Sequence, residues 1–487
     1  MMSGHRGSRC LLAGLLSCGL LFTTASPASA HPRLRGVEPT PEATVEAPLH
    51  QVTLRFTEAL DWKLSRVEVT DADGHPVTDG SPVDQRGAEG HFPIRAGVSG
   101  PMLVSWLVVG EDAHPVQGQF VFAVAPPAGS VASGSLDRQL AALSARAGAF
   151  QGRAGSTGLG WLIRGGRALE ILLLYVVLGL LLLRALVLRP IPAGAGAGGT
   201  GTAGWGPPPY RTLFLAGAGS LALMPILFSL YANRVTELVE GVSVGGVLSS
   251  SLGRVWEMKA VLWALFAVAS LVALRRRDDR HEGLLLALAL SATGAFVLNT
   301  HAQSATPTWL YSGMMWGHVL VTAFWAGGLM AILLVVFPAR DPAAVWPALG
   351  RFSNIMTVTA GAVVASGLVM LMKLAGNWKS LSCTDFGVVA QFKVAIVAVA
   401  LVIGAVNNRL VANHRRGAER PSPNRRGRSV DSLRRIVVAE VVVLTSVLCL
   451  SAALGETELP PVLKGRLLPG EIQESVQPGL LSSGCRG

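Results

Sequence analysis

Charged residues are scarce in this sequence, and their scarcity excludes whole classes of protein. Only 15% of the 487 residues are charged, whereas 50% are hydrophobic and the mean hydropathy is +0.47. A soluble domain of average composition carries about 25% charged residues. A disordered chain is therefore excluded, and a purely soluble enzyme is disfavoured.

Cysteine pairs and nucleotide-binding motifs are also missing. The five cysteines include no CxxC pair, so neither a disulfide scaffold nor a thiolate zinc site is indicated. The GxxxxGK[ST] pattern is absent, which argues against a pump driven directly by ATP. We predict that the protein is not an enzyme.

Residues 1–30 have the pattern of a secretory signal peptide. Arg6 and Arg9 precede a short apolar stretch, and residues 28–30 read Ala-Ser-Ala, a small-residue cleavage site. Cleavage there would make His31 the new N-terminus, where its α-amine and its imidazole can chelate a metal in one ring. Cleavage at Cys18, as in a lipoprotein, is the alternative.

Residues 31–125 predict a small extracytoplasmic all-β domain, an Ig-like or cupredoxin-like sandwich. Short alternating strands, such as 51–56 and 102–109, are separated by turn residues. Near the end, Asp112 and His114 stand two apart, so in an extended segment both point to one face. Nitrogen and oxygen ligands of this kind suit Cu(II), although most Asp-x-His pairs are ordinary loop residues.

The domain resembles the CopC family of periplasmic copper-binding sandwiches. The resemblance is carried by His31-Pro32, Glu38-Pro39, Ala47-Pro48, Val52-x-Leu54-x-Phe56 and the run Gly110-Glu111-Asp112-Ala113-His114-Pro115-Val116-x-Gly118-x-Phe120-x-Phe122. It implies that His31, Asp112 and His114 bind Cu(II). Some members also carry a methionine-rich loop for Cu(I), whereas this domain has only Met102, so we expect no Cu(I) site in it.

The rest of the chain predicts a flexible linker followed by a polytopic all-α membrane domain. Residues 126–160 are rich in Ala, Gly and Ser, which is typical of a tether. Within 161–455 we predict about eight transmembrane helices, at roughly 166–188, 211–231, 255–274, 283–301, 314–337, 354–374, 388–409 and 435–454. Eight spans place the tail, 456–487, on the same outer side as the sandwich.

Basic residues support that topology. They concentrate in the connections predicted to face inward, above all in the arginine-rich stretch 409–435. The positive-inside rule demands such an excess, so we predict a multi-pass plasma-membrane protein. The stretch has no interleaved aromatic residues, so we expect lipid rather than nucleic acid beside it.

Polar residues in apolar spans are costly and mark candidate sites. His301 lies at the outer end of the fourth predicted span. His318 lies one turn into the fifth, and Met314 and Met315 share its helix face. Imidazole with thioether sulfur suits Cu(I), so we predict a possible copper entrance here. The alternative is that the methionines pack the bundle and the histidines make interhelical hydrogen bonds.

Further polar candidates lie in the last two spans. They are Lys393, Asn407 and Glu440, of which Lys393 and Glu440 either pair or face an aqueous cavity. Cys383 and Cys485 are both predicted outside, and the sequence does not fix whether they form a disulfide.

The membrane half resembles the CopD family of copper-resistance membrane proteins. The resemblance is clearest over about 313–455 and rests on Gly317-His318-Val319, Trp325-Ala326-Gly327-Gly328-Leu329, Arg351-Phe352-Ser353, Gly387 with Gln391-Phe392-Lys393, Asn407-x-Arg409 and Arg434-Arg435 with Glu440. A fused sandwich and membrane domain implies a role in copper acquisition and tolerance.

The sequence therefore predicts a copper-handling membrane protein that captures Cu(II) outside and passes copper into or across the bilayer, with uptake as the expected direction. An external copper donor or a reductase would be its partners, besides copper ions and lipid. Two alternatives stay open: a haem or copper oxidoreductase using His301 and His318, and a copper sensor that moves nothing.

Overall fold

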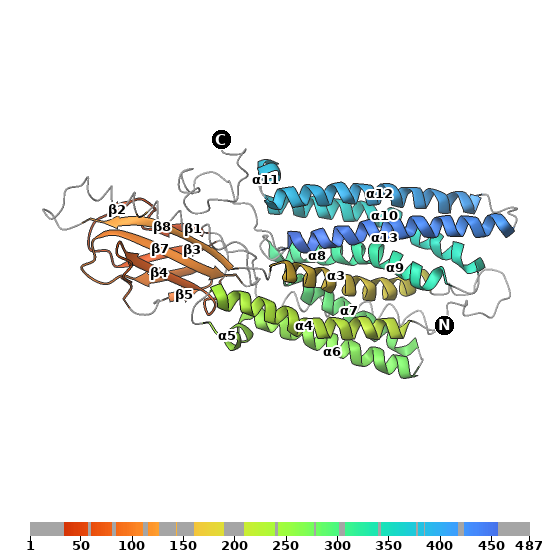
Figure 1. Cartoon of the computed structure of the whole chain (residues 1–487), viewed down its shortest axis with the longest axis horizontal. Coiled ribbons are helices and arrows are strands. Elements are labelled where there is room, and N and C mark those ends of the chain that lie inside the picture. The colour runs from red at the N-terminus through yellow and green to blue at the C-terminus, as the bar shows by residue number, and fades with distance from the viewer. Residues whose placement is uncertain are drawn as a thin grey trace.

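The computed structural model places a β-sandwich at one end of a long helical bundle (Figure 1). It describes residues 34–56, 60–79, 84–110, 115–125, 143, 160–188, 209–238, 242–276, 279–300, 307–338, 342–375, 378–383, 385–416 and 423–455. The predicted signal peptide, the tail 456–487 and nearly all of the predicted linker lie outside these residues. The predicted fold class, a sandwich followed by membrane helices, is confirmed.

The sandwich consists of two four-stranded sheets. Its strands are β1 (Leu34–Glu38), β2 (Thr44–Val45), β3 (Gln51–Phe56), β4 (Arg66–Asp71), β5 (Asp84–Arg86), β6 (Glu89–Pro93), β7 (Gly100–Val109) and β8 (Pro115–Val124). One sheet has the order β1-β3-β6-β5 and the other β2-β8-β7-β4. All neighbours are antiparallel except β2 and β8, which run parallel.

Alternating apolar residues fill the space between the sheets. Leu54 and Phe92 from one sheet pack with Val104 and Phe122 from the other, and all four are buried. This is the period-2 pattern that strands impose on side chains. Met102 is 1% exposed in the same core, so its sulfur is packed away from solvent.

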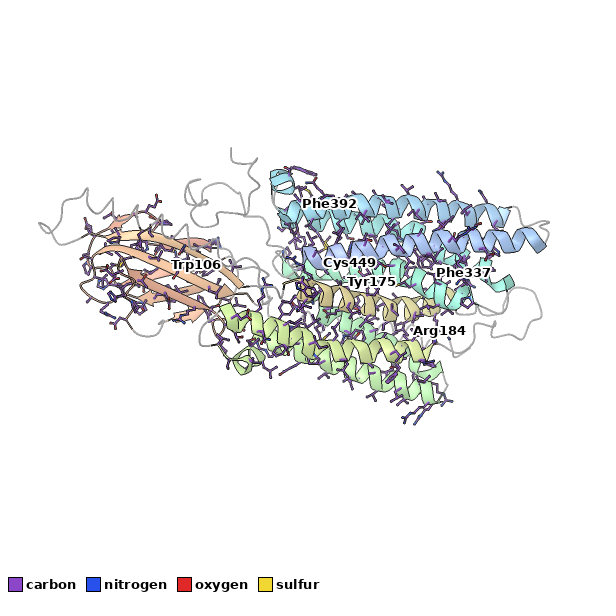
Figure 2. All side chains as sticks on the ribbon, viewed as in Figure 1. Trp106, Tyr175, Arg184, Phe337, Phe392 and Cys449 are labelled. Atoms are coloured by element: carbon purple, nitrogen blue, oxygen red, sulfur yellow. The ribbon has the colours of Figure 1, made fainter. Side chains whose placement is uncertain are left out.

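Trp106, labelled in the sandwich in Figure 2, depends on a glycine opposite it. Its cross-strand partner is Gly118, and a Cβ at that position would stand 2.2 Å from Trp106 Cζ2. The absence of a side chain on β8 therefore makes room for the indole on β7.

The bundle contains long antiparallel helices and a few short turns. They are α3 (Gly160–Leu183), η2 (Arg184–Leu188), α4 (Tyr210–Leu238), α5 (Val244–Leu248), α6 (Ser251–Arg276), η3 (Asp279–His281), α7 (Glu282–Val297), α8 (Thr308–Thr322), η5 (Ala323–Gly327), α9 (Gly328–Ala331), η6 (Ile332–Val336), α10 (Pro342–Ala375), α11 (Trp378–Cys383), α12 (Asp385–Arg416) and α13 (Pro423–Leu454). The segments η2, η5 and η6 are π-helical turns.

Seven helical segments in the described part of the chain are long and apolar enough to cross a membrane. They match seven of the eight predicted spans. The remaining one, 283–301, corresponds to α7, a helix of 16 residues. That length reaches about 24 Å, somewhat less than the roughly 30 Å hydrocarbon core of a bilayer.

Two arginines of the first span nevertheless hold α7 along its whole length. Near the sandwich, Arg167 donates to the carbonyl of Asn299, just beyond the end of α7, at 2.9 Å. At the far end, Arg184 donates to Glu282, the first residue of α7, at 2.7 Å. Figure 2 shows Arg184 at that end. Because the two arginines lie about 25 Å apart along a helix, α7 runs antiparallel to α3 from one end to the other.

The fifth predicted span is one continuous helical segment with two π-helical turns, α8 to η6. It begins at Thr308, six residues earlier than predicted. His318 is therefore ten residues into the helix, at about 15 Å from its start, rather than one turn in.

A backbone contact between glycines fixes this segment against α3. A Cβ on Gly327 of η5 would stand 1.9 Å from the carbonyl oxygen of Tyr175, and one on Gly179 would stand 2.0 Å from the backbone of Gly327. Small residues of this kind let membrane helices approach closely. Beside them, Tyr175 shares a hydrogen bond of 2.7 Å with the hydroxyl of Thr322.

Candidate functional site

The end of the sandwich that faces the bundle gathers chain segments far apart in the sequence. Leu34, the first residue of β1, pairs with Phe56, the last of β3. Val109 and Pro115 pair where β7 and β8 meet. An isolated bridge joins Leu60 to Gly110 at this same end.

This end contacts the bundle directly. Asp61 accepts two hydrogen bonds from Ser251, the first residue of α6, one from its backbone N–H and one from its hydroxyl, both at 3.0 Å. Asp61 is 9% exposed and its own N–H donates to the carbonyl of Val109. Leu64 and Val109 are fully buried in the hydrophobic core of the bundle. A sandwich carboxylate thus caps a helix of the membrane domain.

Four predicted metal ligands lie outside the described residues: His31, Asp112, His114 and His301. Their described neighbours are placed. Residues 112 and 114 fall between Val109 and Pro115, and residue 31 precedes Leu34 by three, so both segments join the sandwich at its bundle-facing end. Residue 301 follows Asn299, whose carbonyl Arg167 holds.

His318 forms a hydrogen bond with a serine of another helix. Its Nδ1 lies 2.9 Å from the hydroxyl of Ser366 on α10. That hydroxyl lies 2.6 Å from the carbonyl oxygen of Ala362 and 3.1 Å from that of Val363. When it donates its proton to one of these carbonyls it accepts from Nδ1–H, and in this tautomer the lone pair of Nε2 is available to a ligand. A histidine that binds metal characteristically donates its other ring N–H in this way.

The two methionines of the predicted entrance have different surroundings. Met315 packs against the hydrophobic core, as the alternative interpretation holds, and Met314 is half-buried. Lys393 of α12 lies close enough to His318 to act on it electrostatically. A protonated Lys393 opposes a cation at this histidine, so a metal there requires the ammonium to lose its proton or move away.

Asn407 and Glu440 are hydrogen-bonded to each other, and Glu440 also contacts a buried tryptophan. Glu440, 2% exposed, accepts from Trp325 Nε1 at 2.9 Å through one oxygen and from the Asn407 side-chain amide through the other. In the described part of the chain Glu440 has no ion pair with Lys393. Instead these residues line a cavity of about 290 Å³, so Glu440 faces a cavity rather than the lysine.

A second buried charge network lies near the sandwich. Glu170 of α3 pairs with Arg167 at 2.8 Å and also with Lys259 of α6, whose ammonium stands 4.2 Å from the Trp256 ring centre. Two cations share one carboxylate here, which ties α3 to α6 and, through Arg167, to the end of α7.

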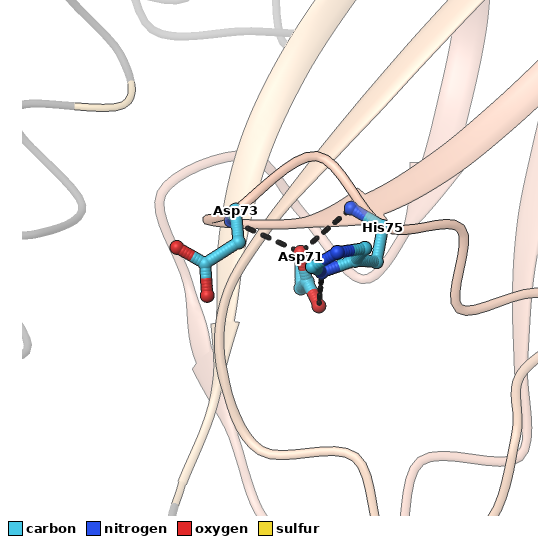
Figure 3. Close-up of side chains that lie close together, drawn as sticks. All are labelled: Asp71, Asp73 and His75. Atoms are coloured by element: carbon cyan, nitrogen blue, oxygen red, sulfur yellow. Dashed lines mark hydrogen bonds and ion pairs between the residues drawn. The ribbon is translucent and has the colours of Figure 1, made fainter.

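One cluster among the described residues has the composition of a metal site: Asp71, Asp73 and His75 (Figure 3). Its geometry is that of a turn, because Asp71 Oδ1 accepts from the backbone N–H of His75 at 2.9 Å and of Asp73 at 3.0 Å. These bonds, that from His75 first, hold the pKa of Asp71 below its ordinary value of 3.8. The cluster lies at the opposite end of the sandwich from Val109.

The sequence interpretation missed several residues of this arrangement. Ser366 and Asp61 carried no signal, because their partners lie 48 and 190 residues away in the chain. Trp325 was part of a quoted motif, but nothing in the motif assigned it a role.

Models of two protein families match separate parts of the chain. The model of the CopC domain matches residues 34–125, and that of Copper resistance protein D matches residues 346–454. Copper resistance protein C of Escherichia coli is 30% identical over 119 residues, which cover 23% of this chain and 94% of that protein.

Two solved structures also show similarity to part of this chain. The structure of CopC from Methylosinus trichosporium OB3b is 25% identical and covers 21% of this chain and 100% of its own, with a TM-score of 0.19. That of PcoC, a methionine-rich copper resistance protein from Escherichia coli, is 29% identical and covers 20% and 99%, with a TM-score of 0.17.

Proposed function

Because the chain belongs to the CopC family through its sandwich and is a fusion of that domain with a CopD domain, we propose that it captures copper outside the membrane and delivers it inward through the bundle. Copper resistance or handling is the function that both families share. That this protein captures copper, delivers it to the bundle and moves it inward is what we propose.

We assign capture to His31, Asp112 and His114 as ligands of Cu(II). An N-terminal amine and imidazole, a carboxylate and a second imidazole form a nitrogen and oxygen set that suits Cu(II). The segments that carry these residues join the sandwich at the end that contacts the bundle, and this is the observation that carries the proposal. Copper captured there has a short distance to travel to the helices.

We propose that copper then binds in the region of four residues: His301, Met314, Met315 and His318. Support comes from His318, whose Nε2 lone pair is available when Nδ1–H donates to Ser366. With thioether sulfur nearby, this region suits Cu(I), so a reductase or a donor of Cu(I) would have to act outside. Positive-inside charge supports an orientation with the sandwich and the tail outside.

Cellular copper tests the proposal. A strain lacking the gene would carry wild type, His31→Ala, His318→Ala or the exposed control Glu257→Gln. At scarce external copper, we expect wild type and the control to restore accumulation and both histidine variants to fail. Equal accumulation in all strains, with Cu(II) still bound by the purified protein, would exclude transport and favour a sensor. A Soret band in the purified protein would favour the oxidoreductase.

A further inference from the structure

The cavity beside Glu440 lies deeper in the bundle than His318. It is bounded by α10, α12, α13 and the π-helical turn η5. Trp325 comes seven residues after His318 on one continuous helical segment, about 10 Å further from the sandwich. The polar residues that line the cavity are Glu440, Asn407, Asn408, Ser353 and Thr357, and most of the other lining residues are apolar.

The carboxylate of Glu440 lacks a positive partner. Both its oxygens accept hydrogen bonds, but the donors, Trp325 and Asn407, are neutral groups. Within the described ranges no lysine, arginine or histidine forms an ion pair with it. A buried negative charge without a counter-charge is costly in a membrane, and such groups mark ion sites or ion pathways.

Asn407 adds an unsatisfied oxygen at the same place. The amide nitrogen of Asn407 donates to Glu440. The other end of that amide, Oδ1, is buried without a hydrogen-bond donor among the described residues. Gly404, one helical turn earlier, leaves the carboxylate room, since a Cβ there would stand 3.1 Å from Glu440 Oε1.

We propose that this cavity binds a hard, singly charged metal cation, with sodium as the physiological candidate, on Glu440 and Asn407 Oδ1. One carboxylate balances one positive charge. The donors that face the cavity are oxygens, which suit hard ions, and no imidazole lines it. Among the lining residues only Met356 carries a thioether, so the cavity has a single soft donor among several oxygens. The cavity has room for water to complete the coordination shell.

The site also offers a source of energy. Sodium that enters through the same bundle down its concentration gradient would drive copper inward. Such a source of energy is needed because the sequence has no GxxxxGK[ST] motif for ATP. This consequence rests on the proposed function, whereas the binding of sodium does not.

Binding is tested on the purified full-length protein in detergent without copper. We would measure binding of radioactive sodium, and thermal unfolding in sodium chloride against N-methyl-D-glucamine chloride at equal ionic strength. Wild type should bind about one equivalent of sodium and unfold about 2–5 °C higher in sodium. Glu440→Gln should lose both effects, and Glu257→Gln, the same change on the exposed side of α6, should keep both.

Asn407→Ser is a second variant in case Glu440→Gln does not fold, and it should weaken sodium binding at least tenfold. Wild type without sodium binding, or Glu440→Gln with unchanged binding, would overturn the proposal. Displacement of sodium by Cu(I) at equimolar protein would also overturn it, because the cavity would then be a copper site. A protein that binds sodium but moves no copper would contradict the proposed function alone.

Discussion

At the scale of single residues, the metal-binding chemistry of His318 depends on Ser366, the residue that its ring contacts. When the Ser366 hydroxyl donates to the carbonyl of Ala362, it accepts from Nδ1–H of His318. In that arrangement Nε2 is the ring nitrogen with the free lone pair. In our proposal His318 binds copper in this region, and Ser366 orients the imidazole ring.

Replacement of Ser366 by Ala should therefore lower copper uptake without unfolding the bundle. Loss of a group that orients a metal-binding histidine costs about 10–100-fold in affinity, so we expect uptake at scarce copper to fall about tenfold. Ser366→Thr keeps the hydroxyl and should restore it. Copper accumulation in cells, with protein amount measured in membranes, checks the result. Normal uptake by Ser366→Ala would show that the tautomer of His318 is irrelevant.

Asp71 makes a pH-dependent contribution to the far end of the sandwich. Its pKa is lowered in the folded state, first by the backbone N–H of His75, so its contribution is present above 3.8 and is lost as pH falls through the depressed value. We expect Asp71→Asn to speed amide exchange in β4 and β7 at pH 6, with a smaller difference from wild type below pH 3.8. Asp79→Asn, the same change at an exposed residue of the sandwich, is the control. A difference independent of pH would contradict this account.

At the scale of elements, hydropathy predicted most of the architecture because a bilayer imposes strong and local requirements on composition. Seven spans were recognised from their apolar runs alone. The limits of the method appear at α7 and α8. Both ends of α7 are bonded by arginines of the first span, Arg167 and Arg184, and α8 begins before its most apolar stretch. The hydropathy of a segment shows neither its contacts with another helix nor a helix start that precedes the apolar stretch.

The candidate sites were predictable in part, for a related reason. Asn407 and Glu440 were noticed as polar residues in apolar helices, but their contact spans 33 positions in the chain. Periodicity within one helix cannot reveal which polar residue of another helix it meets. It also cannot locate the π-helical turn η5, from which Trp325 reaches Glu440. Such turns often occur at functional sites.

The glycine contact between α3 and η5 gives an element-scale prediction. Because a Cβ on Gly327 would overlap the carbonyl of Tyr175, Gly327→Ala must push the two helices apart. We expect a loss of about 1–3 kcal/mol in the free energy of unfolding, the usual cost of overpacking. Gly361→Ala, with open space at its Cβ, is the matched control and should be neutral or slightly stabilising. Thermal unfolding in detergent distinguishes them, and equal melting temperatures would refute the contact.

At the scale of the whole molecule, the junction between the domains is built from ordinary parts. Asp61 caps α6 as any aspartate caps a helix, except that it comes from another domain. Leu64 and Val109 extend the core of the bundle into the sandwich. The junction therefore lies at the end of the sandwich where Leu34, Val109 and Pro115, the described residues nearest to positions 31, 112 and 114, are found.

Asp61→Ala should accordingly separate capture from delivery. It removes the cap of α6, which costs about 0.5–2 kcal/mol, and it weakens the docking of the sandwich. The variant should bind Cu(II) as tightly as wild type, because Asp61 is not a predicted ligand, yet accumulate less copper in cells. Asp73→Ala removes an exposed carboxylate at the opposite end of the sandwich and should leave both properties intact. If Asp61→Ala accumulates copper normally, docking at this end is not needed for delivery, and copper must reach the bundle from a sandwich that moves independently.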